Sequence, residues 1–212
     1  MLLQLALDKP FGPEMIPQLL EAEPFVDIFE AGTPFLYHSG MAAVRLLREA
    51  LPNAVLLADL KLADAGKYET DMALDAGANI VTALSVADDR TIRRALDTAH
   101  ERGARVAVDL LSHPDPVQRA LRLEEMGADI LCAHTGIDSQ AEDGVPFALC
   151  RALKNALSRA KLAAAGGIGA RTVAELCRIG IDIAIVGSAI TSCENIASGA
   201  RAIRREIDKR RG

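Results

Sequence analysis

The stretch Ala58–Ala65, with sequence ADLKLADA, places three charged residues directly after an apolar run. The run Val55-Leu56-Leu57 is typical of a buried strand, and such strands seldom carry charge unless it is paired. Residues two apart on a strand share a face, so Asp59 and Lys61 are expected to point the same way at its carboxyl end. A carboxylate and an amine held there can bind a metal, shift each other's pKa and move protons. A purely structural ion pair explains the pattern equally well.

Along the whole chain, apolar runs of strand length alternate with longer stretches whose apolar residues recur with the period of a helix. Strands are expected near residues 2–7, 26–29, 54–58, 79–83, 105–108, 129–133, 161–164 and 182–186, each followed by a helix. Residues 32–40 and 135–146 are expected to be loops, and the last helix to span about 197–210. Segments 77–80, 127–130 and 180–183 repeat one pattern, a helix that ends on glycine and turns into a buried strand.

Eight such strand–helix units predict one domain over residues 1–212, a single parallel (β/α)8 TIM barrel. A doubly wound open sheet is the competing interpretation. It is disfavoured because no glycine-rich GxGxxG loop follows the first strand, where the sequence reads Leu7-Asp8-Lys9-Pro10.

Composition narrows the possible partners and compartment. Half of the 212 residues are hydrophobic, and the formal net charge is −5. This charge predicts no binding to nucleic acid or to an anionic membrane surface. No apolar run approaches the roughly 20 residues of a membrane span. The four cysteines show no metal-ligand spacing, which is typical of a protein in a reducing cytoplasm.

The residues at the ends of the predicted strands form the candidate site. In chain order they are Asp8, Glu30, Asp59 with Lys61, Ser85, Asp109, His134, Gly166 with Gly167, and Gly187 with Ser188. Barrel active sites are built at this carboxyl-terminal face, so residues far apart in sequence can line one pocket. A single Asp after a strand is most often a turn or cap residue. Six acid, amine or imidazole groups at five strand ends favour a functional site.

Two kinds of ligand are indicated at these strand ends. The pairs Gly166-Gly167 and Gly187-Ser188 after the last two strands are typical of phosphate sites in barrels, although one such pair alone is also ordinary turn chemistry. Glu30 and Asp59 supply the oxygen ligands that Mg²⁺ prefers. His134 is either a buried, hydrogen-bonded residue or the natural proton shuttle near neutral pH.

The motif Asp59-x-Lys61-x-x-Asp64 resembles the signature of the orotidine 5′-monophosphate decarboxylase suprafamily. Segments 3–8, 30–34, 58–65, 134–136 and 165–168 closely resemble the 3-hexulose-6-phosphate synthase family within it. The resemblance covers essentially the whole chain. It implies a TIM barrel of the ribulose-phosphate-binding type and Mg²⁺ as cofactor. It also implies a homodimer with shared active sites, in which the equivalent of Asp64 reaches the neighbouring subunit.

The related 3-keto-L-gulonate-6-phosphate decarboxylases share the metal and the enediolate intermediate, so the motif alone does not choose the reaction. Those relatives carry Glu, Arg and Thr where this chain has Asp109, Ile137 and Ala165, which favours the synthase. Loss of the Arg removes a charged contact for an acid substrate. The decarboxylase stays as the alternative, and a sugar-phosphate-binding barrel without turnover is the alternative of another class.

The synthase resemblance implies the aldol addition of formaldehyde to D-ribulose 5-phosphate, giving D-arabino-hex-3-ulose 6-phosphate. Mg²⁺ would be held by Glu30 and Asp59, and the base would be His134 or Asp109. Lys61 would stabilise the enediolate. The remaining residues are expected at the substrate: Asp8 and Asp64 on Lys61 and the sugar hydroxyls, Gly166, Gly167, Gly187 and Ser188 on the phosphate, and Ser85 and Ala165 along the pocket.

Overall fold

The computed structural model describes residues 1–209 of the chain, and these form a closed barrel of eight parallel strands in sequence order. The strands are β1 (Leu2–Leu7), β2 (Ile28–Ala31), β3 (Val55–Leu62), β4 (Ile80–Leu84), β5 (Arg105–Asp109), β6 (Ile130–His134), β7 (Lys161–Ala165) and β8 (Ile183–Val186). The last strand closes the barrel by pairing in parallel with the first. The (β/α)8 TIM barrel predicted from the alternating pattern is confirmed.

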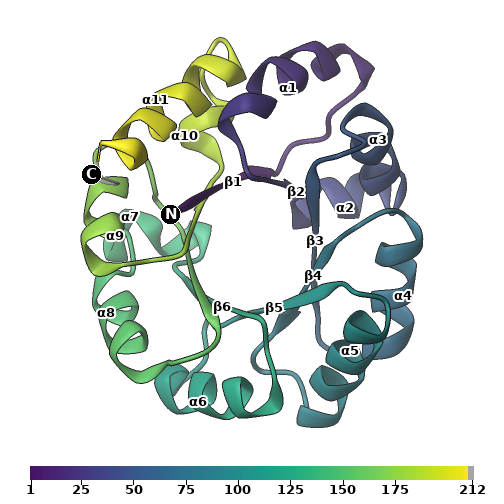
Figure 1. Cartoon of the computed structure of the whole chain (residues 1–212), viewed down its shortest axis with the longest axis vertical. Helices are drawn as coiled ribbons and strands as arrows, with labels where there is room; N and C mark the ends of the chain where they lie inside the picture. The colour runs from purple at the N-terminus through teal and green to yellow at the C-terminus, as the bar shows by residue number, and fades with distance from the viewer. Residues whose placement is uncertain (210–212) are drawn as a thin grey trace.

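Helices form the outer ring around these strands (Figure 1). They are α1 (Ile16–Ala22), α2 (Thr33–Ser39), α3 (Ala42–Ala50), α4 (Gly66–Asp75), α5 (Asp89–Glu101), α6 (Pro116–Met126), α7 (Gln140–Asp143), α8 (Phe147–Ala156), α9 (Val173–Ile179), α10 (Ser188–Thr191) and α11 (Ile196–Asp208), with short 3-10 turns at Pro13–Met15, Glu23–Phe25 and Ile137–Ser139. No helix among the described residues is long and apolar enough to cross a membrane.

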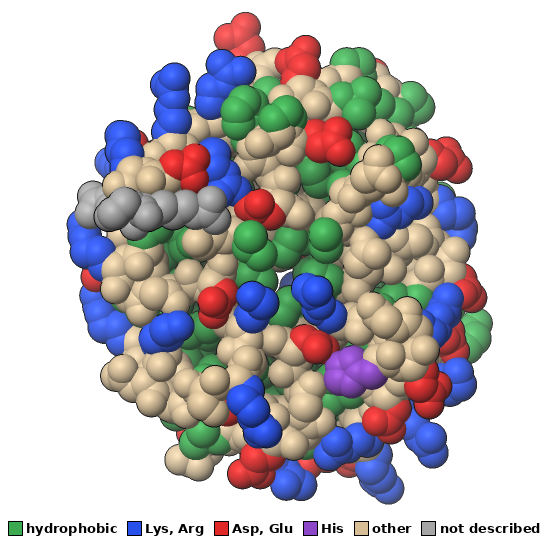
Figure 2. Space-filling model, in the orientation of Figure 1, with side chains coloured by type: hydrophobic (Ala, Val, Ile, Leu, Met, Phe, Trp, Pro, Cys, Tyr) green, Lys and Arg blue, Asp and Glu red, His purple; other side chains and the backbone are tan. Residues whose placement is uncertain are grey.

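The barrel has two separate apolar cores, because each strand buries both of its faces. The larger core lies between strands and helices, and a smaller one fills the barrel interior with Ile28, Leu57, Ile80, Ile130 and Ile183. Stacked branched side chains of this kind make a TIM barrel interior a packed core rather than a pore. On the face shown in Figure 2, acidic and basic side chains are interspersed over the outer helices.

The repeated helix–glycine–strand pattern sets where the helices end. Gly127 and Gly180 cap α6 and α9 in the left-handed conformation, with φ of 97° and 85°. A residue other than glycine would be strained there, since its Cβ crowds the following carbonyl. These turns lead directly into β6 and β8, so each strand starts at a fixed point of the barrel floor.

Three local expectations differ from the structure. Residues 33–39 form helix α2 rather than a loop, because Pro34 occupies the first turn, where a missing N–H costs nothing. Strand β3 runs on to Leu62 instead of ending at Ala58. The expected loop at 135–146 contains one 3-10 turn and the short helix α7. The predicted end of the last helix at Arg210 lies outside the described residues.

Candidate active site

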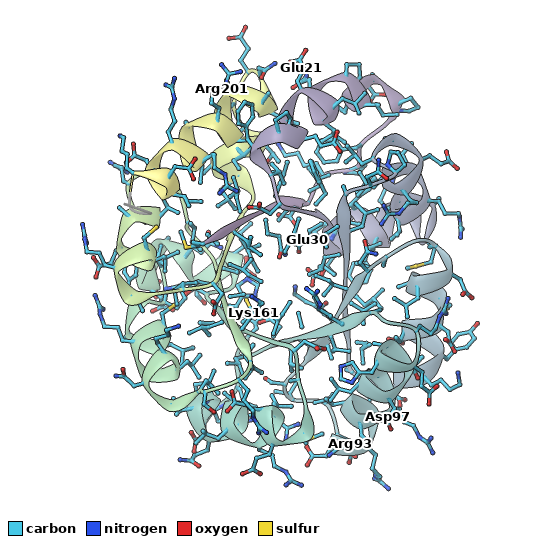
Figure 3. The ribbon with its side chains drawn as sticks, in the orientation of Figure 1. Glu21, Glu30, Arg93, Asp97, Lys161 and Arg201 are labelled. Carbon is cyan, nitrogen blue, oxygen red and sulfur yellow. The ribbon has the colours of Figure 1, made fainter. Side chains whose placement is uncertain are left out.

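A cavity of about 410 Å³ opens at the carboxyl ends of the strands. Eleven of the thirteen residues predicted for the site line it: Asp8, Glu30, Asp59, Lys61, Asp109, His134, Ala165, Gly166, Gly167, Gly187 and Ser188. Figure 3 shows one of them, Glu30, toward the barrel interior, whereas Glu21, Arg93, Asp97 and Arg201 lie on the outer helices. The barrel thus gathers chemistry-bearing groups from seven different strand ends into a single pocket.

Asp59 lies at the centre of the hydrogen-bond network in this cavity and is 5% exposed. Its Oδ2 accepts hydrogen bonds from Lys61 Nζ and Thr33 Oγ1, both at 2.6 Å, and its Oδ1 accepts one from Thr82 Oγ1 at 2.8 Å. Burial raises the pKa of Asp59, but the Lys61 charge and these hydrogen bonds outweigh burial and hold the pKa below its usual range. Asp59 is therefore ionised.

Lys61 reaches Asp59 by an irregular backbone path. Its φ is 48°, in the left-handed region, and the pairing of β3 with β4 shifts register between Ala58 and Leu62. The expected Asp59–Lys61 contact is present, but regular strand alternation does not produce it. Nζ lies 2.6 Å from Asp59 Oδ2 and 3.6 Å from Asp109 Oδ2. Burial lowers the pKa of Lys61, yet the two carboxylates together raise it above the ordinary value, so the amine is charged.

Among the carboxylates of the cavity, Glu30 has the surroundings that least favour the charged form. It is 6% exposed, and Gln4 Nε2 donates to its Oε2 at 2.6 Å. Burial, with the nearby charge of Asp59, raises the pKa of Glu30 to about 8. Glu30 and Asp59 are thus two buried carboxylates that repel each other. Within residues 1–209 no group of three or more His, Cys, Asp or Glu side chains is placed to hold a metal.

His134 and Asp109, the two predicted candidates for the base, are hydrogen-bonded to each other. His134 Nδ1 lies 2.8 Å from Asp109 Oδ2, and Asp109 Oδ1 accepts from the N–H of Leu111 at 2.9 Å. We assign the tautomer from this contact: in the neutral imidazole, with the Asp109 carboxylate as the acceptor, Nδ1 carries the proton and Nε2 carries the lone pair. His134 is then the group able to take a proton, and Asp109 orients it.

In the loops after β7 and β8, the backbone of glycine residues lines the cavity. Gly166 and Gly167 have φ of 97° and 67°, and a Cβ on Gly166 would lie 2.2 Å from the carbonyl oxygen of Thr135. Only glycine fits there, and its exposed backbone N–H groups are suited to an anion. In the loop after the neighbouring strand β8, a Cβ on Gly187 would meet the Asp8 carboxylate at 3.0 Å. Burial, followed by the charge of Asp59, raises the pKa of Asp8.

Two predicted site residues lie outside the cavity of this chain. Ser85 is buried, but its hydroxyl has no hydrogen-bond partner within the described residues, and its backbone N–H donates to the Asp109 carbonyl. Ser85 is not among the residues that line this cavity, because β4 ends at Leu84 and it is Thr82 of this strand that reaches the cavity; a substrate contact by Ser85 stays a prediction. Asp64 is exposed, and its Oδ1 accepts from the N–H of Ala65 at 2.7 Å.

Three cavity residues were missed because they carry no charge. Gln4, Thr33 and Thr82 each donate a hydrogen bond to Glu30 or Asp59. For two of them the sequence did hold a signal: Gln4 and Thr82 are single polar residues inside otherwise apolar strands. A buried polar side chain needs a partner, and a strand-end carboxylate is the nearest available one.

Comparison with known proteins agrees with this geometry. The model of the orotidine 5′-phosphate decarboxylase / HUMPS family matches residues 1–203. A 3-hexulose-6-phosphate synthase of Bacillus subtilis (strain 168) is 40% identical over 205 residues, 97% of this chain and 98% of the relative.

Two solved structures extend the comparison. The 3-hexulose-6-phosphate synthase of Salmonella typhimurium superposes with a TM-score of 0.94 at 40% identity, covering 99% of this chain and 100% of the other. The 3-keto-L-gulonate-6-phosphate decarboxylase of Vibrio cholerae gives 0.84 at 25% identity, covering 98% and 97%. The chain is therefore an enzyme that belongs to the orotidine 5′-phosphate decarboxylase / HUMPS family.

Proposed function

We propose that this enzyme is an Mg²⁺-dependent aldolase that adds formaldehyde to D-ribulose 5-phosphate, giving D-arabino-hex-3-ulose 6-phosphate, and cleaves the product in reverse. The observation that carries the proposal is one cavity holding the Glu30–Asp59 carboxylates, the Lys61 amine and the His134–Asp109 pair. Full-length similarity to proteins named 3-hexulose-6-phosphate synthase supports the same reaction.

The donor set of the cavity fits Mg²⁺. Glu30 and Asp59 are hard oxygen donors, and the charge of Asp59 is one cause of the raised pKa of Glu30. A divalent cation would relieve that repulsion. Mg²⁺ commonly takes one or two carboxylates and fills its other positions with water and substrate oxygens. When bound, Mg²⁺ polarises the substrate oxygens and stabilises negative charge on them.

The protein side chains account for the proton and charge transfers. His134 Nε2 takes the proton from C1 of the sugar, and Asp109 stabilises the imidazolium that results. The charged Lys61 faces the negative charge that develops on the enediolate oxygens. C1 then forms a bond to the formaldehyde carbon, and the proton held by His134 passes to the new alkoxide. Atoms and charge balance, and His134 is regenerated.

The phosphate is assigned to the glycine loops. Gly166, Gly167, Gly187 and Ser188 line the cavity, and their backbone N–H groups would be the donors to an anion. Backbone donors allow an anion to bind although the chain is acidic overall.

A shared active site in a homodimer is part of the proposal. Asp64 lies outside its own cavity, and large apolar side chains are exposed near it. Tyr68 (68% exposed) and Met72 (37%) share one face of α4, and Tyr37 (85%) lies on α2. Exposed apolar groups gathered in this way mark an interface. A second subunit that packs there would bring its Asp64 to the first subunit's Lys61.

The decarboxylation of 3-keto-L-gulonate 6-phosphate is the second candidate, and Ile137 argues against it. This side chain stands at the cavity mouth and is 81% exposed. An aliphatic group there offers no charged contact to a substrate carboxylate. The deciding experiment incubates the enzyme with ribulose 5-phosphate and formaldehyde, with Mg²⁺ or with a chelator. Mg²⁺-dependent loss of formaldehyde supports the synthase, whereas CO₂ release from the gulonate substrate with no formaldehyde consumption refutes it.

A further inference from the structure

The irregular pairing between β3 and β4 lies beside the catalytic Lys61. Ala58 pairs with Val81 and Leu62 pairs with Ala83, so residues 59, 60 and 61 of β3 stand opposite the single residue Thr82 of β4. A bulge of this kind re-aims side chains and interrupts the backbone ladder. Here it leaves the N–H of Lys61 without a carbonyl partner on β4, and it places Lys61 at a φ of 48°.

The hydroxyl of Thr82 fills that gap. Thr82 is 7% exposed, and its Oγ1 accepts a hydrogen bond from Lys61 N at 2.8 Å. The same Oγ1 donates to Asp59 Oδ1 at 2.8 Å. Because an N–H can only donate and an ionised carboxylate can only accept, the direction of both bonds is fixed. One side chain thus connects the backbone of the lysine with the carboxylate that its amine contacts.

We propose that Thr82 is a positioning residue, whose hydroxyl holds the left-handed turn at Lys61 and thereby keeps the Lys61 amine against Asp59. Without the hydroxyl, a buried N–H and one carboxylate oxygen both lose their partner. The turn then has no side chain to hold it in a conformation that a non-glycine residue disfavours. Lys61 is then free to leave this turn, and its amine is no longer held in a fixed position against Asp59.

The catalytic part of this inference rests on the proposed function and is tested by three variants. Thr82→Val removes the hydroxyl at nearly constant volume, and Thr82→Ser restores it. Thr70→Val is the matched control, because Thr70 is also a fully buried threonine, and its hydroxyl has no partner within the described residues. We expect Thr82→Val to lower kcat on the order of 10²-fold, the scale expected when a reacting group is displaced by about 1 Å.

The separation of kcat from KM distinguishes positioning from general damage. KM for ribulose 5-phosphate should change little in Thr82→Val, since the phosphate loops follow β7 and β8 on other strands of the barrel. Thr82→Ser and Thr70→Val should keep the wild-type kcat. A wild-type kcat in Thr82→Val, or an equal loss in Thr82→Ser, would overturn the proposal.

Amide hydrogen exchange followed by NMR tests the structural part without any assay of turnover. The Lys61 amide should be protected in the wild type, in Thr82→Ser and in Thr70→Val, and should exchange at least tenfold faster in Thr82→Val. Thr82→Ala gives the same comparison should the valine variant not fold. Equal protection with and without the hydroxyl refutes the inference. If the wild type consumes no formaldehyde, the proposed function fails, while the exchange data still decide the role of Thr82.

Discussion

Binding of Mg²⁺ at pH 7 should release almost one proton, and Glu30 should be its source. In the metal-free protein, burial and the charge of Asp59 hold the pKa of Glu30 at about 8. A carboxyl group with that pKa is protonated in about nine molecules of ten at pH 7, so about 0.9 proton must leave when a cation binds the carboxylate. Since the pKa is raised, the proton competes with the metal below pH 8. Affinity should rise roughly tenfold per pH unit up to about pH 7.5 and level off above pH 8.

Isothermal titration calorimetry measures this release directly. Titrations with Mg²⁺ at pH 7 in buffers of different ionisation enthalpy give the number of protons taken up by the buffer. Glu30→Gln should lose both the release and most of the affinity. Gln4→Leu is the matched variant: the Gln4 hydrogen bond lowers the pKa of Glu30, so its removal should weaken binding at pH 7 while binding at pH 9 is affected less.

Two results would refute this reasoning. Tight Mg²⁺ binding at pH 7 with no proton release would show that Glu30 is already ionised or is not a ligand. An unchanged pH dependence in Glu30→Gln would assign the proton to another group. Either result would also remove the physical argument that a cation is needed to offset the charge of two buried carboxylates.

Three further predictions address stability and assembly. Arg48 donates to four backbone carbonyls and to one side-chain amide at the amino-terminal end of β3 and β4, so Arg48→Met should cost about 2–4 kcal/mol in urea unfolding while kcat is retained. Burial raises the pKa of Glu124, but the backbone N–H donors of residues 158–160 outweigh burial and lower the pKa below its ordinary value. The difference in free energy of unfolding between the wild type and Glu124→Gln should therefore be largest above pH 4.5 and shrink below it. Asp64→Asn and Lys61→Ala should each be inactive alone, and a mixture of the two proteins should recover about a quarter of the wild-type activity. Half of the dimers in the mixture contain one subunit of each variant, and each such dimer has one intact site of two. No recovery would exclude a shared site.

The barrel and most of the site were predictable because both follow from strand-level patterns. Buried strands alternate with amphipathic helices, and parallel strands bring their carboxyl ends to one face. Asp8 and His134 follow two strands and are 126 residues apart in sequence, and yet they line the same cavity. Neither conclusion requires any knowledge of side-chain contacts.

The geometry within β3 could not be predicted in the same way. Strand alternation alone places Asp59 and Lys61 on one face, and the sequence of β3 gives no sign that three of its residues stand opposite one of β4. That register shift depends on a partner strand and on a hydroxyl 21 residues further along the chain. The position of Ser85 outside the cavity could not be predicted for a related reason, since the strand boundary and not the residue type decides which way it faces.

The surroundings of Asp59 favour its charged form, whereas those of Glu30 favour its protonated form, and this difference sets the roles of the two carboxylates. Asp59 accepts from three side chains and stays ionised whether or not a cation is present. Among the described residues Glu30 accepts from Gln4, and a pKa of about 8 leaves it mostly protonated at neutral pH unless a cation compensates its charge. In the proposed Mg²⁺ site, the Asp59–Lys61 pair would therefore be assembled before the metal binds, and the ionisation of Glu30 would complete the site. Loss of the charge on Glu30 should then abolish metal binding but leave Lys61 in place, whereas Asp59→Asn should disturb both at once.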